Sequence, residues 1–191
     1  MMSLSSKTIY TVKDIYELPD GERAELIDGK IYNMEYPNRM HQYLLEKLSR
    51  KIGNYIIEHH EKGEVYIAPF AVFIENDEKN YVEPDISVIC DLNKLDDRGC
   101  NGAPDWIIEI ASSGSRRMDY LTKLFKYRSA GVREYWIVNP MNKDVMTYFF
   151  GEPENGDLCL FNEDIPVGIY PGFTIKIDEL LKKYKLLRRN R

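Results

Sequence analysis

Residues 106–140, WIIEIASSGSRRMDYLTKLFKYRSAGVREYWIVNP, decide the fold. The stretch begins with a short apolar run, Trp106–Ala111, which is typical of a buried strand. A helix is expected from about Arg116 to Ala130, where apolar residues recur at three- and four-residue steps, and a second apolar strand follows at Glu134–Val138. A strand, a helix and another strand within about 35 residues indicate a parallel crossover unit.

The residues before this unit predict antiparallel strands and one long helix. Asp28-Gly29 is a strong hairpin dipeptide, so residues 24–34 are interpreted as two strands. From Pro37 to about His60 apolar residues recur at helical spacing, and Gly63 stands where a glycine that ends a helix belongs. Three runs rich in β-branched and aromatic residues follow as expected strands: Val65–Ile67, Phe70–Ile74 and Ile86–Cys90.

The remaining segments complete a mixed sheet. Asp91–Ala103, dense in Asp, Asn and Gly, is expected to be a loop. Further strands are expected after the crossover unit, at Val145–Phe150, Leu158–Phe161 and Phe173–Ile175. We therefore predict the α/β class in its broad α+β sense, with a mixed β-sheet flanked by helices on both faces.

Length and charge predict one domain with a basic end. The 191 residues fit a single domain, residues 1–191. The net charge of −5 is uneven, because residues 178–191 hold six Lys or Arg against two acids, and a basic C-terminal helix is expected at about 177–191. The uncharged stretch Val65–Ile74 is far short of the roughly 20 residues of a spanning helix. The first ten residues lack the pattern of a leader, so we expect a cytoplasmic protein without membrane association.

Two expected strands each contain a carboxylate among apolar residues. Asp85 begins the run Asp85–Ile89, and Glu109 interrupts the run Trp106–Ile110. An ionised carboxylate in apolar surroundings costs several kcal/mol unless a cation compensates it. A divalent cation such as Mg²⁺ or Mn²⁺, which takes one or two carboxylates together with water and phosphate oxygens, fits this pair if the strands are neighbours. The alternative is that each acid faces solvent from a half-exposed strand.

The helix after Glu109 carries a lysine that could reach this pair. Asp119 and Lys123 lie four residues apart and share a helix face. Leu121, Leu124, Phe125 and Tyr127 are expected to mark the buried side of this helix. Lys123 borders that side, so its ammonium could extend over the strand end at Glu109, whereas Lys126 is expected to matter little. A surface ion pair with Asp119 is the simpler alternative for Lys123.

Two further polar residues lie in apolar segments. Glu25 is an acid within the first hairpin strand and is interpreted as an additional metal ligand, a base beside the metal, or an outward-facing acid at a sheet edge. His41 lies on the apolar face of the long helix beside Leu44 and Leu45, where a core histidine with satisfied hydrogen bonds is the commoner outcome.

Five segments, taken in order, carry a family resemblance. They are residues 24–29 (AELIDG), 41–42 (HQ), 83–88 (EPDISV), 107–110 (IIEI) and 131–140 (GVREYWIVNP), with Ser112-Ser113, Asp119, Lys123 and Tyr127 between the last two. In this order and spacing they resemble the Uma-type family of restriction endonucleases, part of the PD-(D/E)XK nuclease-like superfamily. The resemblance covers roughly residues 8–175.

The resemblance implies a metal site at the end of the central strands. Asp85 matches the motif aspartate and Glu109 the motif acid, so both are implied as Mg²⁺ or Mn²⁺ ligands together with the Ile110 carbonyl. The superfamily places a lysine two residues after the acid, where this chain has Ala111. Lys123 is the natural substitute for that lysine as a catalytic residue, and Glu25 would bind a metal water or a second ion.

The implied reaction is metal-dependent hydrolysis of phosphodiester bonds in DNA. Phosphate contacts are expected from Arg116, Arg117 and Arg39, although each of these can also be an ordinary solvated charge. DNA is the expected substrate, and a homodimer is an assembly that the sequence allows. The alternative is a non-catalytic nucleic-acid-binding or scaffold protein that retains the nuclease fold; an enzyme acting on a small molecule ranks third.

Overall fold

Two parallel strands form the centre of the molecule. In this computed structural model, which describes residues 9–112, 118–182 and 184, β8 (Trp106–Ile110) pairs in parallel with β9 (Glu134–Asn139). Every residue of both strands is buried, because helices or other segments cover both faces of the sheet here. Trp106 and Trp136 meet edge to face with ring centroids 5.0 Å apart, which fixes the two strands against one another.

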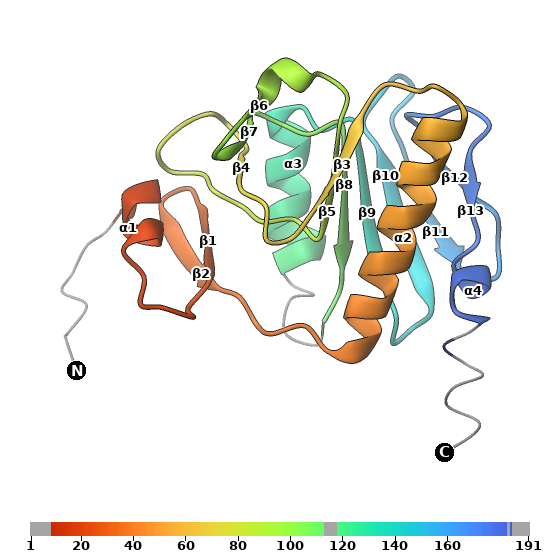
Figure 1. Cartoon of the computed structure of the whole chain (residues 1–191), viewed down its shortest axis with the longest axis horizontal. Helices are drawn as coiled ribbons and strands as arrows, with labels where there is room; N and C mark the ends of the chain where they lie inside the picture. Colours follow the sequence, from red (N-terminus) through yellow and green to blue (C-terminus); the bar gives the residue numbers. More distant parts are fainter. Residues whose placement is uncertain (1–8, 113–117, 183, 185–191) are drawn as a thin grey trace.

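The sheet around this pair has six strands and is otherwise antiparallel. Its order is β11-β10-β9-β8-β5-β3, so the prediction of a mixed sheet is confirmed. The four outer strands are β3 (Glu64–Ile67), β5 (Ile86–Ile89), β10 (Asp144–Phe149) and β11 (Asn155–Leu160). Each lies close to its predicted position, and Figure 1 shows the strands side by side between the helices.

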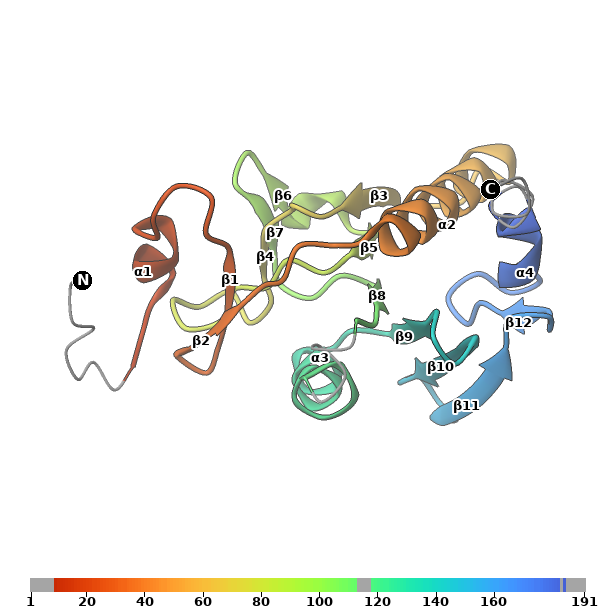
Figure 2. The same ribbon diagram turned by 90° about the horizontal axis from the view of Figure 1, so that it is seen from below.

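The long helix α2 (Arg39–Glu58) covers one face of the sheet (Figures 1 and 2). Asn38 caps its first turn by accepting hydrogen bonds from the backbone N–H groups of Met40 and His41. At its other end the left-handed residue is His60, with φ of +53°, and Gly63 instead leads into β3. The expected helix end at about His60 is therefore confirmed to within two residues, whereas Gly63 does not cap the helix, because the C-cap is His59.

The crossover helix lies on the opposite face of the sheet (Figure 2). It consists of a π-helical turn, Met118–Lys123, followed by α3 (Leu124–Ala130), and Gly131 ends it with φ of +92° as expected. Tyr127 is buried in the core on this face. Leu121 and Phe125 are 61% and 74% exposed, so the predicted buried side is wrong for these two residues. Bonding in a π-turn runs from i to i+5, which rotates side chains away from the positions that ordinary helical spacing predicts.

Two small sheets extend the molecule beside β5. The hairpin β1 (Ala24–Ile27) and β2 (Lys30–Asn33) turns at Asp28-Gly29, both with positive φ, as predicted. The second small sheet joins β4 (Val72–Phe73), β6 (Leu95–Asp96) and β7 (Gly99–Asn101). A 3₁₀ turn at Leu92–Lys94 comes directly before β6. The expected loop at 91–103 is therefore partly ordered into strands that are too short to show an alternating pattern.

The first and last helices of the described chain lie at opposite sides of the molecule (Figure 1). A short helix α1 (Val12–Tyr16) packs against the hairpin, while β12 (Ile165–Pro166), β13 (Thr174–Ile175) and α4 (Ile177–Leu180) join the core beneath α2. Most of the predicted basic helix lies outside the described residues. Within the described part of the chain, no helix is long and apolar enough to cross a membrane.

Candidate active site

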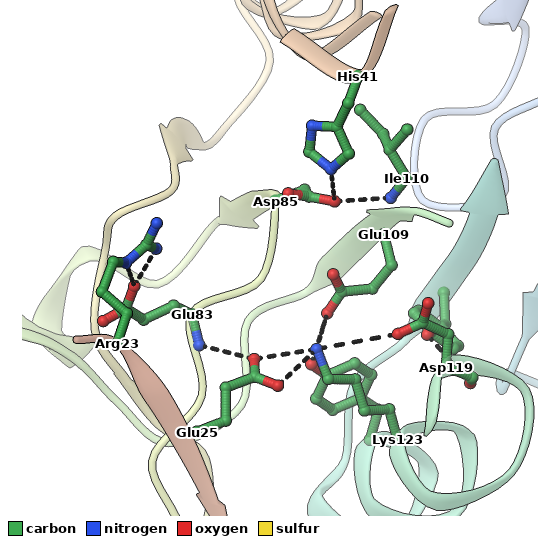
Figure 3. A network of polar contacts seen from close by, with 11 residues as sticks. Arg23, Glu25, His41, Glu83, Asp85, Glu109, Ile110, Asp119 and Lys123 are labelled. Carbon is green, nitrogen blue, oxygen red and sulfur yellow. Dashed lines mark hydrogen bonds and ion pairs between the residues drawn. The ribbon is translucent and has the colours of Figure 1, made fainter. Parts of the chain in front are cut away.

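Strands β5 and β8 bring the two predicted acids to one end of the sheet. These strands are antiparallel, and Ile86 pairs with Ile108. One step further along this register places Asp85 across from Glu109. Asp85 directly precedes β5, at the same end of the sheet at which β8 finishes. Figure 3 shows both carboxylates there.

Asp85 is held by a backbone group and a histidine. The Ile110 N–H donates to its Oδ2 at 2.7 Å, and the Nε2 atom of His41 lies 3.0 Å from the same oxygen (Figure 3). His41 comes from the first turn of α2, so it is a partner of the site instead of the core histidine that the sequence favoured. Its Nδ1 atom is buried and has no hydrogen-bond partner among the described residues.

Lys123 extends from the π-turn to the second acid. Its Nζ donates to Glu109 Oε1 at 2.9 Å and lies 2.8 Å and 2.9 Å from the two carboxylate oxygens of Glu25 (Figure 3). Asp119 Oδ1 is 3.9 Å from the same nitrogen. Glu109 and Ala111 are two residues apart along one extended segment, so their side chains lie on the same sheet face. A lysine from the following helix thus reaches the motif acid in this chain.

Glu25 is buried and faces inward, so the interpretation as an outward-facing edge acid is wrong. Its side chain is only 5% exposed, and its Oε1 also accepts the backbone N–H of Glu83 at 3.1 Å. Glu25 therefore holds Lys123 against β8, and it links the hairpin to the segment that carries Asp85.

Charge within this cluster is unbalanced. Burial raises the pKa of Glu109 to about 8, and repulsion from Asp85, Asp119 and Glu25 acts in the same direction. The attraction of Lys123 lowers the pKa but does not outweigh these effects. Although burial disfavours a charged amine, these neighbouring carboxylates raise the pKa of Lys123 well above its usual value. Among the described residues, the ammonium of Lys123 thus faces the carboxylates of Glu25, Glu109 and Asp119 in a poorly solvated site.

A tyrosine supports the motif acid. The Tyr127 hydroxyl donates to Glu109 Oε1 at 2.9 Å, and burial raises the pKa of this phenol well above its usual value. The hydroxyl therefore stays protonated and acts as a fixed donor. Because Lys123 donates to the same oxygen, Oε1 of Glu109 is occupied by protein donors, which leaves Oε2 for other partners.

Lys126 connects the crossover helix to the hairpin turn. Its Nζ lies 2.5 Å from Asp28 Oδ1 and 3.1 Å from Glu75 Oε2, and its side chain is buried. These contacts are structural, so the expectation that Lys126 contributes little to cleavage stays a prediction. Lys126 ties α3 to the hairpin that carries Glu25.

The acids line a cleft of about 460 Å³. Arg23 also lines it, with its guanidinium bound to the Glu83 carboxylate. The predicted phosphate contact Arg39 does not line this cleft, since its guanidinium lies 5.0 Å from the centre of the Tyr184 ring. Arg116 and Arg117 lie outside the described residues, so their roles stay predictions.

The donor set fits a hard divalent cation. Mg²⁺ takes one or two protein carboxylates and completes its shell with water and phosphate oxygens, which Asp85 and Glu109 allow. Within the described residues no group of three or more His, Cys, Asp or Glu side chains could hold a metal ion by itself. A cation at these two acids would therefore need water or substrate oxygens to complete its shell. The excess of buried negative charge around Lys123 is the feature that a cation would neutralise.

Sequence reasoning assigned no site role to two residues that contact the acids. The sequence placed His41 on the apolar face of α2, and nothing local to it indicates a contact with Asp85. The sequence predicted that Tyr127 is buried, but it did not indicate the hydrogen bond to Glu109. Its position four residues after Lys123, on the same side of the helix, was the available signal.

Similarity to known proteins defines the class of this fold. The structure matches a crystal structure from Anabaena variabilis that is described as a putative nuclease belonging to DUF820, with a TM-score of 0.71 and 19% sequence identity. The match covers 89% of this chain and 96% of that chain. The chain therefore has a nuclease-like fold, as predicted.

The family follows from the sequence match. The model of the Uma2 family, described as "putative restriction endonuclease", matches residues 12–173. The chain belongs to the Uma2 family, which confirms the resemblance stated above. No match was found among proteins of curated function.

Proposed function

We propose that this chain is a metal-dependent endonuclease that hydrolyses phosphodiester bonds in DNA. The observation that carries the proposal is the meeting of Asp85, Glu109 and Lys123 inside a cleft, at the end of the sheet where β5 begins and β8 finishes. Two acids from neighbouring strands and a buried lysine are the groups that such hydrolysis needs. Family membership and the nuclease-like fold support the same reading. A cytoplasmic location and a homodimer stay predictions from the sequence.

Asp85 and Glu109 would hold Mg²⁺ or Mn²⁺, with the Ile110 carbonyl as a third donor. When bound, such an ion supplies positive charge that polarises a phosphate and lowers the pKa of water. The Ile110 N–H and His41 orient the Asp85 carboxylate, and Tyr127 orients that of Glu109. These donors fix both acids before substrate arrives.

Lys123 would stabilise the charge that develops on the phosphate. Its ammonium is 2.9 Å from Glu109 and is held in place by Glu25. A positive charge that is already positioned needs no reorganisation when negative charge builds up on the phosphate oxygens, so it lowers the barrier more than it raises affinity. Glu25 is thus a positioning residue in this scheme.

Cleavage of a supercoiled plasmid tests the proposal. Purified protein is expected to nick the plasmid with Mg²⁺ or Mn²⁺ and not in EDTA. Asp85→Asn and Glu109→Gln are each expected to lower the rate at least about a hundredfold, since losing one preorganised charge costs about 3–4 kcal/mol of transition-state stabilisation. Glu58→Gln, which changes an exposed acid at the end of α2, is the matched control and should cleave like wild type.

Two outcomes would contradict the proposal. Rates near wild type in both site variants would show that the site is assigned to the wrong residues. A folded wild-type protein that cleaves no nucleic acid with either metal would favour the non-catalytic binding or scaffold alternative.

A further inference from the structure

The described part of the cleft offers few cations to a phosphate backbone. Its described lining includes six acidic side chains, one histidine, His41, and two side chains of lysine or arginine, Arg23 and Lys123. Arg23 is bound to Glu83, and Lys123 is bound to Glu25 and Glu109. A double helix is held largely by basic contacts to the phosphates of both its strands. The described lining is therefore poorly matched to a duplex.

Several aromatic and apolar side chains also line this cleft. Tyr32, Met34 and Tyr36 occupy alternate positions along β2 and the segment after it, and all three line the cleft. Met141, which is 64% exposed, lines it from the turn after β9. Figure 1 shows the segment that joins β2 to α2 running past the end of the sheet at which β8 finishes.

Tyr36 is exposed and yet held in place. Its side chain is 83% exposed, and its hydroxyl donates to the Gly21 carbonyl at 2.9 Å. Gly21 has φ of +87°, a conformation that favours glycine, so the turn that presents this carbonyl is defined by the sequence. The hairpin that leads to Tyr36 also carries Glu25, which binds Lys123. The ring is thus connected through one hairpin to the reacting end of the cleft.

From these features we infer that the cleft takes an unpaired nucleotide strand, with the Tyr36 ring as the surface on which a base stacks. Unpaired bases expose their faces, so they can stack on an aromatic side chain. Such stacking adds affinity where the described lining offers few basic contacts to phosphates. Phosphates would then be contacted mainly where the metal and Lys123 lie. The inference rests on the proposed function, because it names the nucleic-acid form that this site would act on.

Binding of matched oligonucleotides separates base stacking from phosphate attraction. Fluorescence anisotropy is measured in Ca²⁺ buffer with three labelled probes: a single strand of about 12 nucleotides, the duplex of the same sequence, and an abasic strand of the same length. The single strand is expected to bind about tenfold tighter than either of the others. The abasic strand keeps every phosphate, so it reports the electrostatic part alone.

Three variants test the ring itself. Tyr36→Ala is expected to weaken single-strand binding about tenfold and to leave abasic binding unchanged, whereas Tyr36→Phe keeps the ring and should stay within about twofold of wild type. Phe125→Ala removes another exposed aromatic ring that does not line the cleft, so it should change nothing. Equal melting temperatures for the four proteins show that folding is retained.

The outcomes separate this inference from the proposed function. Equal binding of the abasic and normal strands, tighter binding of the duplex, or no effect of Tyr36→Ala would each overturn the inference. Plasmid nicking that depends on Asp85, combined with binding that does not depend on Tyr36, would keep the nuclease and reject the unpaired strand. Binding that depends on Tyr36, in a protein that cleaves nothing, would support the strand and reject the nuclease.

Discussion

Lys123 carries the positive charge at the centre of the candidate site. Its side chain is 6% exposed, and it is bound to Glu25 and Glu109, which are equally buried. Removing one partner of a buried ion pair leaves the other charge without compensation and costs about 3–5 kcal/mol. The lysine is therefore as important for holding the hairpin and helix against the sheet as for any chemistry.

Lys123→Met is expected to lower the free energy of unfolding by about 3–5 kcal/mol in metal-free buffer, because Glu25 and Glu109 stay buried without a cation. Lys126→Met should cost about 1 kcal/mol, since the acids that bind Lys126 are partly exposed and solvent screens the interaction. Urea unfolding measures both. Lys13→Met, at an 81% exposed lysine, is the control. Equal losses in the Lys123 and Lys126 variants would contradict this assignment of charge.

At the scale of elements, the start of α2 depends on one capping side chain. Asn38 Oδ1 accepts from Met40 N at 2.9 Å and from His41 N at 3.0 Å. Asn38→Ala is expected to lower the free energy of unfolding by about 1 kcal/mol, whereas Asn38→Ser should retain most of it because serine also caps. Thermal or urea unfolding of the two variants measures this difference in stability. A serine variant as unstable as the alanine variant would argue against capping.

Glu134 joins β9 to the segment before β13. Its carboxylate accepts from the backbone N–H groups of Gly168 at 3.0 Å and Ile169 at 2.8 Å. Burial nevertheless raises the pKa of Glu134 above its usual 4.5. The folded state therefore holds this proton more tightly than the unfolded chain, so the contribution of Glu134 to stability is full at low pH and is lost as pH rises from about 4.5 through the folded pKa.

The pH dependence of unfolding tests this effect. Between about pH 4 and pH 7, the stability of wild type relative to Glu134→Gln is expected to fall as pH rises, because the variant has no proton to lose. Glu58→Gln, at an exposed acid, should follow wild type in parallel. A difference between wild type and Glu134→Gln that stays constant with pH would show that the carboxylate is already ionised throughout this range.

How well each strand or helix was predicted depended on how clearly its apolar residues form a pattern in the sequence. Strands β8 and β9 were predicted closely because both faces are buried and the apolar runs are continuous. Strands β6 and β7 were missed because two or three residues cannot show alternation. Leu121 was placed on the wrong side because the π-turn changes the spacing of the helix.

The site was predictable only in part for a related reason. Asp85 and Glu109 stand out as charges within apolar runs, and the register of two neighbouring strands then brings them together. His41 and Asp85 meet because α2 packs across the sheet, and that packing leaves no trace in the residues next to either one. Local patterns thus indicated the acids, whereas the groups that orient them required the tertiary structure.

At the scale of the whole molecule, folding itself concentrates negative charge. The hairpin supplies Glu25, the sheet supplies Asp85 and Glu109, and the crossover helix supplies Asp119, so like charges are brought together only in the folded state. Repulsion between carboxylates in a poorly solvated cleft opposes folding unless a cation compensates it. A cation that binds the folded chain should therefore raise its stability, whether or not the protein cleaves nucleic acid.

Thermal unfolding with and without metal measures this coupling. If the dissociation constant is about 1 mM, then ~10 mM Mg²⁺ adds roughly 1.4 kcal/mol, which raises the melting temperature of a domain of this size by about 3–6 °C. Mn²⁺ and Ca²⁺ should act similarly. Asp85→Asn should melt at or above wild type without metal, because repulsion is relieved, and should gain almost nothing when metal is added. Glu58→Gln should keep the full response. An absent shift in wild type, or an equal shift in Asp85→Asn, would remove the physical basis for a metal at these two acids.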